Sequence, residues 1–399
     1  MIPYGRQSVT QTDIDAVVDV LRSDFLTQGP IVPRFEQAVA SHVGAAHAIA
    51  VNSATSALHI ACLALGLGAG DVLWTVPNTF VASANCARYC GADVDFVDID
   101  SSTWNISIPA LEEKLAAAKR AGRLPAVLVP VHFSGQPTDQ QDIWELSKKY
   151  GFKVLEDASH SIGASRQGEP AGSCRWSHIA VFSFHPVKII TSGEGGMALT
   201  RDESLASRMR LFRSHGIVRD AENFVNVRGG DLNLPAELPP PAWCYEQQLL
   251  GFNYRMTDIH AALGLSQLER LGDNVRRRNT LAERYTAAMQ SFPLQPPLVR
   301  SENCSAFHLY VVRVRNGSVD GTRRRVFDEL RRAGIAVNVH YTPVHLQPYY
   351  RALGFREGQY PESETYGREA LTLPLFPALG QEQQDYVIAH VRNVLESAA

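Results

Sequence analysis

The chain lacks the features that would place it in a membrane or in the secretory pathway. It has no run of about 18 consecutive apolar residues, the length that a membrane-spanning helix needs. Residues 1–9 are largely polar and lack the basic and apolar regions of a secretory signal. These absences predict a cytoplasmic protein that makes no contact with a membrane.

A strong charge of one sign is also lacking. The 38 Lys and Arg residues and the 41 Asp and Glu residues give a net charge of −3. No global positive field is therefore expected to attract nucleic acid. Two compact basic runs, arginines 276–278 and 323–325, are predicted to be solvated helix faces.

Cysteine is sparse, with six residues in 399, and only Cys86 and Cys90 lie close together. That pair has neither the spacing nor the histidine neighbours of a zinc site, so we predict no metal and place the two thiols on a helix face. Scattered, reduced thiols are typical of a cytosolic protein.

Apolar residues, in contrast, make up 45% of the chain, enough for a sizeable core and two domains. Up to about residue 200, short strands rich in Val, Ile and Phe alternate with helices. The predicted strands are 48–51, 72–76, 93–97, 126–131, 153–156 and 179–184, and the predicted helices are 12–21 (capped by Thr12), 57–65, 108–118 and 140–150. This alternation predicts an α/β fold with a mostly parallel central sheet flanked by helices on both faces.

This alternation of strands and helices ends at residues 222–241, which are rich in glycine and proline and are predicted to form a long loop. The elements predicted beyond it are a long helix at 257–290 capped by Thr257, strands at 309–314 and 336–339, and helices at 323–333 and 382–395. We therefore predict a large α/β domain over residues 12–255 and a smaller α+β domain over 256–399, joined by the N-terminal segment 1–11.

Residues 181–196 combine a strand end, a lone lysine and a glycine-rich turn. Lys188 stands among apolar neighbours, where desolvation lowers the pKa of an amine and keeps it neutral for Schiff-base formation. Ser183 lies close enough across the turn to donate to a phosphate. A lysine in apolar surroundings more often extends its ammonium group to solvent, but the flanking residues favour the functional interpretation.

Asp157 and His160 follow a predicted strand, at the edge where open α/β sheets bind ligands. In a pyridoxal enzyme, such an aspartate pairs with the pyridinium nitrogen and maintains the ring as an electron sink. We predict that role for Asp157, and for His160 a contact with the phenolic oxygen or the face of the ring. The alternative for Asp157 is an ordinary helix cap.

Two further segments complete the predicted site. Residues 52–56 form a polar turn between a strand and a helix, whose free N–H groups suit an anion, although such a turn can also be an ordinary cap. Phe80 can stack on a planar ring, whereas an aromatic residue in this position is more often part of a core. With Ser183, the turn predicts a phosphate site.

Together these motifs resemble those of the DegT/DnrJ/EryC1/StrS sugar aminotransferases, a family of fold-type I enzymes that depend on pyridoxal 5'-phosphate (PLP). Two segments carry the resemblance most specifically, Ser-Phe-His-Pro-Val-Lys at 183–188 and Gly-Phe-Asn-Tyr-Arg-Met-Thr-Asp at 251–258. The resemblance implies an aminotransferase that acts on a keto-sugar linked to a nucleotide. Residues 338–341 and 347–350 are most similar to the pseudaminic-acid branch, which implies transfer from L-glutamate to C4 of a UDP-linked 4-keto sugar.

The resemblance also implies roles for individual residues. Lys188 would form the Schiff base and move the proton, Asp157 would pair with the pyridinium nitrogen, and Phe80 would stack on the ring. Asn253 matches a residue that reaches the cofactor phosphate of the neighbouring subunit, which implies a homodimer with shared sites. The other implied contacts of the cofactor or the sugar nucleotide are Tyr4, Asp24, Phe25, Leu26, Thr27, Ala54, Thr55, His160, Ser183, Asn338, Val339, His340 and Tyr341.

Other functions remain open at this point. A sugar C3 dehydratase on the same fold uses a histidine where Lys188 stands. A cofactor-binding regulator would carry a DNA-binding module, and none is evident in the sequence. A third alternative is an α/β domain in which the lysine is structural.

Overall fold

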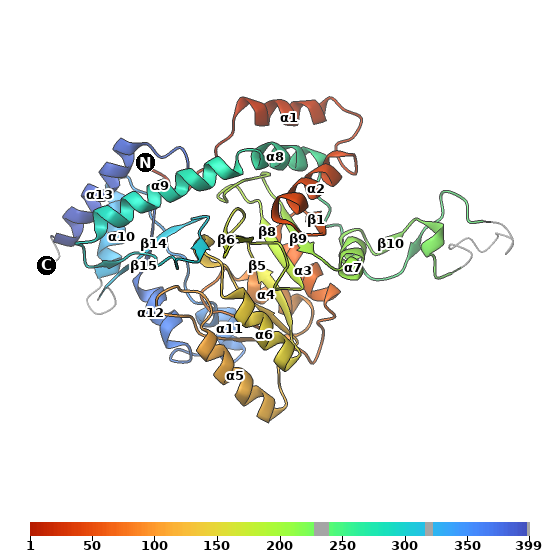
Figure 1. The fold of residues 1–399 in the computed structure, drawn as a ribbon, viewed down its shortest axis with the longest axis horizontal. Coiled ribbons are helices and arrows are strands. Elements are labelled where there is room, and N and C mark those ends of the chain that lie inside the picture. The colour runs from red at the N-terminus through yellow and green to blue at the C-terminus, as the bar shows by residue number, and fades with distance from the viewer. Residues whose placement is uncertain (227–238, 316–321, 397–399) are drawn as a thin grey trace.

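The structure, a computed structural model, describes residues 1–226, 239–315 and 322–396 (Figure 1). Its central sheet has seven strands in the order β1-β9-β8-β5-β4-β2-β3. β9 runs antiparallel to β1 and β8, and the remaining neighbours run parallel. The strands are β1 (His47–Val51), β2 (Val72–Thr75), β3 (Asp93–Phe96), β4 (Val127–Val129), β5 (Lys153–Asp157), β8 (Ile179–Ser183) and β9 (Gly196–Thr200). The prediction of a mostly parallel sheet is confirmed.

Alternate residues of each strand pack into different cores, because successive side chains of a strand point to opposite faces. In β8, Ile179 and Val181 pack with residues of α3, α4 and α7, whereas Ala180 and Phe182 pack with residues of α2 and α8. The helices that cover the sheet are α2 (Ile31–Val43), α3 (Ala54–Ala64), α4 (Ala82–Tyr89), α5 (Ile108–Ala121), α6 (Gln140–Tyr150), α7 (Glu203–Arg213) and α8 (Asp258–Leu268). Both faces are therefore covered, as the sequence predicts.

A second sheet, in the order β12-β14-β15, forms a separate core with three helices at the end of the molecule where both termini lie (Figure 1). Its elements are β12 (Leu294–Gln295), β14 (Tyr310–Val314), β15 (Ala370–Leu373), α9 (Leu271–Met289), α10 (Thr322–Arg332) and α13 (Gln381–Glu396). The shorter elements are α1 (Gln11–Leu21), β6 (Ser165–Arg166), β7 (Glu169–Pro170), β13 (Asn303–Cys304), α11 (Pro348–Ala352), α12 (Pro361–Glu369) and the 3-10 turns η1 (Phe133–Gly135), η2 (Ala221–Asn223) and η3 (Val344–Leu346).

Three local predictions are wrong. The helix predicted at 257–290 is two helices, because the backbone at Arg270 leaves the helical region (φ −102°, ψ 7°), where the Arg270 side chain pairs with Asp13. The strand predicted at 336–339 does not form, because Ala336 pairs with Ile2 and only an isolated bridge joins the next residues to β15. The cap of α1 is Thr10 rather than Thr12, since Thr10 and Asp13 form a reciprocal capping box.

The basic run at 276–278 is only partly a solvated face, and this prediction is wrong for its third member. Arg278 is 1% exposed, and its guanidinium donates to the carbonyl oxygens of Phe307 (3.1 Å), His308 (3.2 Å) and Leu375 (3.0 Å). Burial lowers the pKa of Arg278 to about 10. This arginine therefore ties α9 to the segment that precedes β14.

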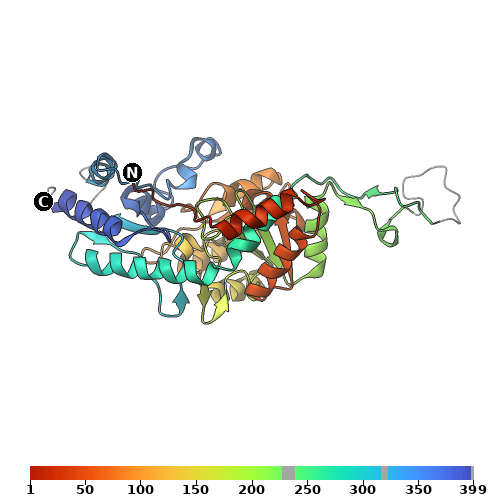
Figure 2. The ribbon, with the colours of Figure 1, turned by 90° about the horizontal axis from the view of Figure 1, so that it is seen from above.

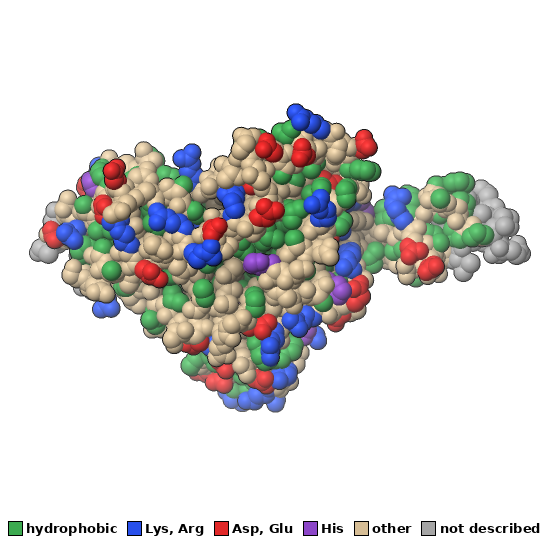
Figure 3. Space-filling model, turned by 45° about the horizontal axis from the view of Figure 1, so that its top comes forward, with side chains coloured by type: hydrophobic (Ala, Val, Ile, Leu, Met, Phe, Trp, Pro, Cys, Tyr) green, Lys and Arg blue, Asp and Glu red, His purple; other side chains and the backbone are tan. Residues whose placement is uncertain are grey.

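An arm projects from the large sheet, on the side away from the termini (Figure 2). At its base, β10 (Ile217–Val218) pairs with β11 (Glu246–Gln247). Of the loop predicted at 222–241, residues 227–238 lie outside the described residues. Hydrophobic side chains gather on the described part of the arm (Figure 3). Trp243 (73%) and Leu250 (80%), on the arm and the adjoining chain, are among the exposed large apolar residues. In the part of the chain that the structure describes, no helix is both long and apolar enough to span a membrane.

Candidate active site

A cavity of about 450 Å³ lies at the carboxyl ends of the parallel strands. Asp157 and Ser183 are the last residues of β5 and β8, and Ser53 and Phe80 follow β1 and β2. The predicted residues that line this cavity are Tyr4, Ala54, Thr55, Phe80, Asp157, His160, Ser183, Lys188, Asn338, Val339, His340 and Tyr341. The topology of the sheet thus brings together side chains that are far apart in the sequence.

Asp157 is buried at the cavity, and its carboxylate accepts two hydrogen bonds. The Ser83 hydroxyl of α4 donates to its Oδ2 atom (2.6 Å), and the backbone N–H of Ser159 donates to Oδ1 (3.1 Å). Thr79 lies 2.7 Å from Ser83 and donates to it, since the Ser83 proton is already engaged. Asp157 caps no helix in this structure, so the alternative interpretation of this residue as a helix cap is wrong.

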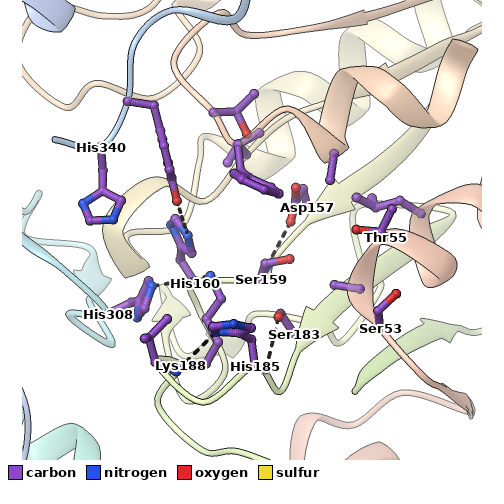
Figure 4. A pocket seen from close by; sticks show the side chains of 18 of the residues that line it. Ser53, Thr55, Asp157, Ser159, His160, Ser183, His185, Lys188, His308 and His340 are labelled. Atoms are coloured by element: carbon purple, nitrogen blue, oxygen red, sulfur yellow. Dashed lines mark hydrogen bonds between the residues drawn. The ribbon is translucent and has the colours of Figure 1, made fainter. Parts of the chain in front are cut away.

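The N-terminus of α3 forms another wall of the cavity. Ser53 caps the helix and accepts the N–H of Ser56 (3.1 Å), whereas the first N–H groups of a helix have no acceptor within it. Ala54 and Thr55, which carry these first N–H groups, line the cavity with the Ser183 hydroxyl nearby (Figure 4). Free N–H groups and the positive end of a helix dipole suit an anion such as a phosphate.

Gly196, the first residue of β9, allows this helix end to approach the sheet. A Cβ atom at position 196 would lie 2.4 Å from Ala54 N and 2.5 Å from Ser53 C, both backbone atoms that cannot rotate away. The absence of a side chain at Gly196 is therefore a condition for the observed position of the α3 N-terminus.

We accordingly expect Gly196→Ala to displace the α3 N-terminus and to weaken phosphate and PLP binding at least about tenfold, the equivalent of ~1.4 kcal/mol. Titration of the cofactor-free protein with PLP, followed by absorbance, measures the change. Gly68→Ala is the matched control, because a Cβ atom at that position meets nothing within 4 Å. Equal PLP affinity of the two variants would show that the close approach does not shape the anion site.

Lys188 lies in the turn between β8 and β9, and three buried histidines, His160, His308 and His340, line the same cavity, as does the exposed His185 (Figure 4). Its Nζ atom is 3.4 Å from His308 Nε2. Burial lowers the pKa of Lys188 to about 8, and the nearby Asp157 carboxylate opposes this shift. Lys188 therefore lines the cavity rather than extending to bulk solvent, as the alternative interpretation required.

The three histidines are neutral. Burial and the charge of Lys188 hold the pKa of His160 and of His308 well below the usual range, and lower that of His340 to about 4. His160 Nδ1 accepts the N–H of Ser134 (3.3 Å), so its Nε2 carries the proton and faces the Tyr341 hydroxyl oxygen (3.3 Å). The buried imidazole rings of the cavity are thus uncharged.

Phe80 is 58% exposed and its ring centroid lies 6.2 Å from that of Tyr341. It is not a core residue, so the structural alternative for this side chain is wrong. The groups that sequence reasoning missed are Ser83 and Thr79, which support Asp157, and His308, which contacts Lys188. Each is brought to the cavity by packing, without a local sequence motif.

Five predicted residues lie outside this cavity. Asn253 is exposed and pairs through its backbone with Ser214. Asp24, Phe25, Leu26 and Thr27 are exposed as well. Thr27 forms a bridge with Thr257, and Leu26 accepts the N–H of Asp258 (3.0 Å), so these residues lie beside the segment that follows Asn253. Asn253 and residues 24–27 therefore share one surface of the chain.

Residues 7–392 match the model of the DegT/DnrJ/EryC1/StrS aminotransferase family. SpsC of Bacillus subtilis, a spore coat polysaccharide biosynthesis protein, is 37% identical over all of this chain and 98% of its own length. PseC of Helicobacter pylori, an aminotransferase of pseudaminic acid biosynthesis, is 29% identical with a TM-score of 0.87 over 99% of both chains. Spr1654 of Streptococcus pneumoniae in its PMP form, the aminated state of the cofactor, is 28% identical with a TM-score of 0.89 over the whole of both chains.

The chain therefore belongs to the DegT/DnrJ/EryC1/StrS aminotransferase family, whose members depend on PLP. The residues present fit that cofactor. A buried carboxylate is available for a pyridinium nitrogen, a helix N-terminus and a serine hydroxyl for a phosphate, and a lysine of lowered pKa for an aldehyde. The lysine also counts against the dehydratase alternative, which uses a histidine at this position.

Proposed function

We propose that the chain transfers the amino group of L-glutamate to C4 of a UDP-linked 4-keto-6-deoxy-N-acetylhexosamine. The product would be UDP-4-amino-4,6-dideoxy-N-acetyl-β-L-altrosamine, a precursor of pseudaminic acid. The observation that carries an aminotransferase function is the convergence of Lys188, Asp157 and the α3 N-terminus on one cavity. The fold similarity to PseC supports the choice of sugar.

PLP, when bound, supplies an electron sink that stabilises negative charge at the carbon losing its proton. Lys188 would hold the cofactor and then act as the base, because a pKa of about 8 leaves about a tenth to a fifth of its amine neutral near physiological pH, far more than an ordinary lysine. Asp157, fixed by Ser83, would keep the ring nitrogen protonated. Ala54, Thr55 and Ser183 would bind the phosphate, and Phe80 would stack on the ring.

The sugar nucleotide would lie against the wall formed by Tyr4 and residues 338–341, which faces the same cavity. The Tyr4 ring packs on His340, with centroids 5.4 Å apart. These aromatic and amide side chains suit a sugar ring, which offers both apolar C–H faces and hydroxyl groups.

The purified enzyme should be assayed with L-glutamate against a panel of UDP- and dTDP-linked 4-keto sugars, with products identified by mass spectrometry and NMR. The expected result is a kcat/KM at least about tenfold higher for the UDP-linked N-acetyl sugar of the altro series than for the others. Preference for a bacillosamine-type, perosamine-type or dTDP-linked sugar would overturn the substrate proposal while leaving the aminotransferase function intact.

For Asp157→Asn we expect cofactor binding to persist and kcat to fall on the order of 10²- to 10⁴-fold. Loss of one partner of a buried charge pair costs about 3–5 kcal/mol, and here that cost falls on the protonated ring nitrogen that drives the reaction. Steady-state kinetics with saturating PLP measures the effect.

Glu156→Gln is the matched control for Asp157→Asn. Glu156 is the preceding residue of β5 and is also a buried carboxylate, but it accepts the Gln140 amide (2.7 Å) and does not line the cavity. We expect this variant to lose stability rather than turnover. A rate for Asp157→Asn close to that of Glu156→Gln would mean that another group serves the ring.

A further inference from the structure

His308 contacts Lys188, the proposed reactive lysine. It lies outside the sequence motifs that carry the family resemblance. It lies just before β14, yet its Nε2 atom is 3.4 Å from Lys188 Nζ, across 120 residues of sequence. Its side chain is buried, with 4% exposure, and it lines the cavity. A contact of this kind can fix the direction in which a flexible lysine chain points.

The backbone of His308 is held on two sides. Arg278 donates to its carbonyl oxygen from α9, and the Ser134 hydroxyl donates to the carbonyl oxygen of the next residue, Leu309 (2.7 Å). Gly135 packs so closely that a Cβ atom there would lie 3.0 Å from the N atom of His308. The imidazole is therefore presented from a rigid segment.

The ring of His308 is restrained as well. Its centroid lies 4.4 Å from that of His160, which is itself bonded to Ser134 and Tyr341. The Nδ1 atom of His308, in contrast, is buried and has no hydrogen-bond partner among the described residues. Among the described residues, Lys188 is therefore the group whose contact decides which tautomer this ring adopts.

An imidazole with a free tautomer can serve a lysine in both of its protonation states. A charged Lys188 donates to the Nε2 lone pair, and a neutral Lys188 accepts from an Nε2–H group. We propose that His308 is a positioning residue, which holds the Lys188 amine in place while that amine exchanges protons with the substrate. This inference rests on the proposed aminotransferase function.

The test compares two substitutions of equal length, His308→Gln and His308→Met. Gln retains a polar atom that can bond to the lysine, whereas Met fills the same space without one. The other acidic and imidazole groups that line the cavity, Asp157, His160, His185, Glu194 and His340, are unchanged in both variants. Circular dichroism and thermal melting verify that both proteins are folded.

The first readout is independent of turnover. Each protein is loaded with pyridoxamine phosphate, which leaves Lys188 uncoupled, and trace acylation of Lys188 is followed against pH by peptide mass spectrometry. We expect the same midpoint in the parent and in His308→Gln, and a midpoint lower by about one pH unit in His308→Met, because the ammonium loses an acceptor. Equal midpoints in all three proteins, or equal shifts in the two variants, would overturn the proposal.

The second readout is the kinetic isotope effect with α-deuterated L-glutamate. In His308→Met, kcat should fall about tenfold or more with little change in KM. The observed isotope effect should rise, because slower proton transfer then limits the overall rate. His308→Gln should recover most of the rate. If the parent protein does not use glutamate, the proposed function fails, while the acylation profile still tests the contact.

Discussion

Replacing Lys188 with alanine is expected to leave a folded protein whose transaminase turnover is lower by on the order of 10⁴-fold or more. The side chain lines a cavity and makes a polar contact with His308, so its loss removes little packing. In the proposed mechanism, the substitution would remove both the covalent attachment of the cofactor and the base of lowered pKa. Steady-state assays, with pyridoxamine phosphate added in excess, measure the residual rate.

A covalent readout accompanies this prediction. Borohydride treatment of the parent protein should abolish its visible absorption band and fix the cofactor to Lys188, as mapped by peptide mass spectrometry. Lys153→Ala removes an exposed lysine at the start of β5 and serves as the control, with parent-like activity and labelling. Turnover of Lys188→Ala within tenfold of the parent, or labelling of another lysine, would contradict the assignment.

The part of the site that the sequence predicts depends on one topological rule. Parallel strands end at the same edge of a sheet, so polar residues that directly follow predicted strands are expected to meet. Asp157 directly follows a predicted strand, Ser183 lies near the end of another and Thr55 lies shortly after a third, and the three residues line one cavity. The rule requires only that each strand be recognised, which the short runs of Val, Ile and Phe allowed.

The supporting residues could not be predicted in the same way. Ser83 reaches Asp157 across 74 residues and His308 reaches Lys188 across 120, and neither contact has a local pattern. Both arise from the packing of an element, α4 or the segment before β14, onto the sheet. Their identity as serine and histidine gives no indication of their partners until the tertiary structure is known.

The prediction that Arg278 is solvated is wrong, although the sequence contains a signal for its burial. A triplet of arginines indicates a solvated face, but helical periodicity treats its members differently. Arg278 continues the spacing of the buried residues Leu271, Val275, Ala282 and Tyr285 along α9. The hydrophobic stripe of the helix, rather than the local charge density, determines which arginine is buried.

The position of Asn253 bears on whether two subunits share their active sites. Asn253 and Asp24 to Thr27 are exposed and absent from the cavity of their own chain, yet the family resemblance assigns both to the site. Exposed apolar side chains, Phe25 (52%) and Leu26 (48%), lie on the same surface. We propose that this surface meets a second copy of the chain and that Asn253 completes the partner's cavity.

A mixture of two inactive variants, Lys188→Ala and Asn253→Asp, is therefore expected to regain activity after subunit exchange. Asn253→Asp alone should be inactive, because its carboxylate would repel the phosphate of the cofactor in the neighbouring subunit. In a heterodimer, one site combines an intact Lys188 with an intact Asn253, and the other site carries both defects. Random exchange places one intact site in about half of the dimers, so recovery should approach about a quarter of the parent activity.

The control mixture combines Lys188→Ala with Asp157→Asn. Both residues line the cavity of their own chain. Every heterodimer then has one defect in each site, and the activity should not exceed that of Asp157→Asn alone. Native mass spectrometry verifies that heterodimers form in both mixtures. Heterodimers without recovered turnover in the first mixture would show that Asn253 does not act across the interface, and recovery in both mixtures would show that exchange stabilises the variants without sharing of sites.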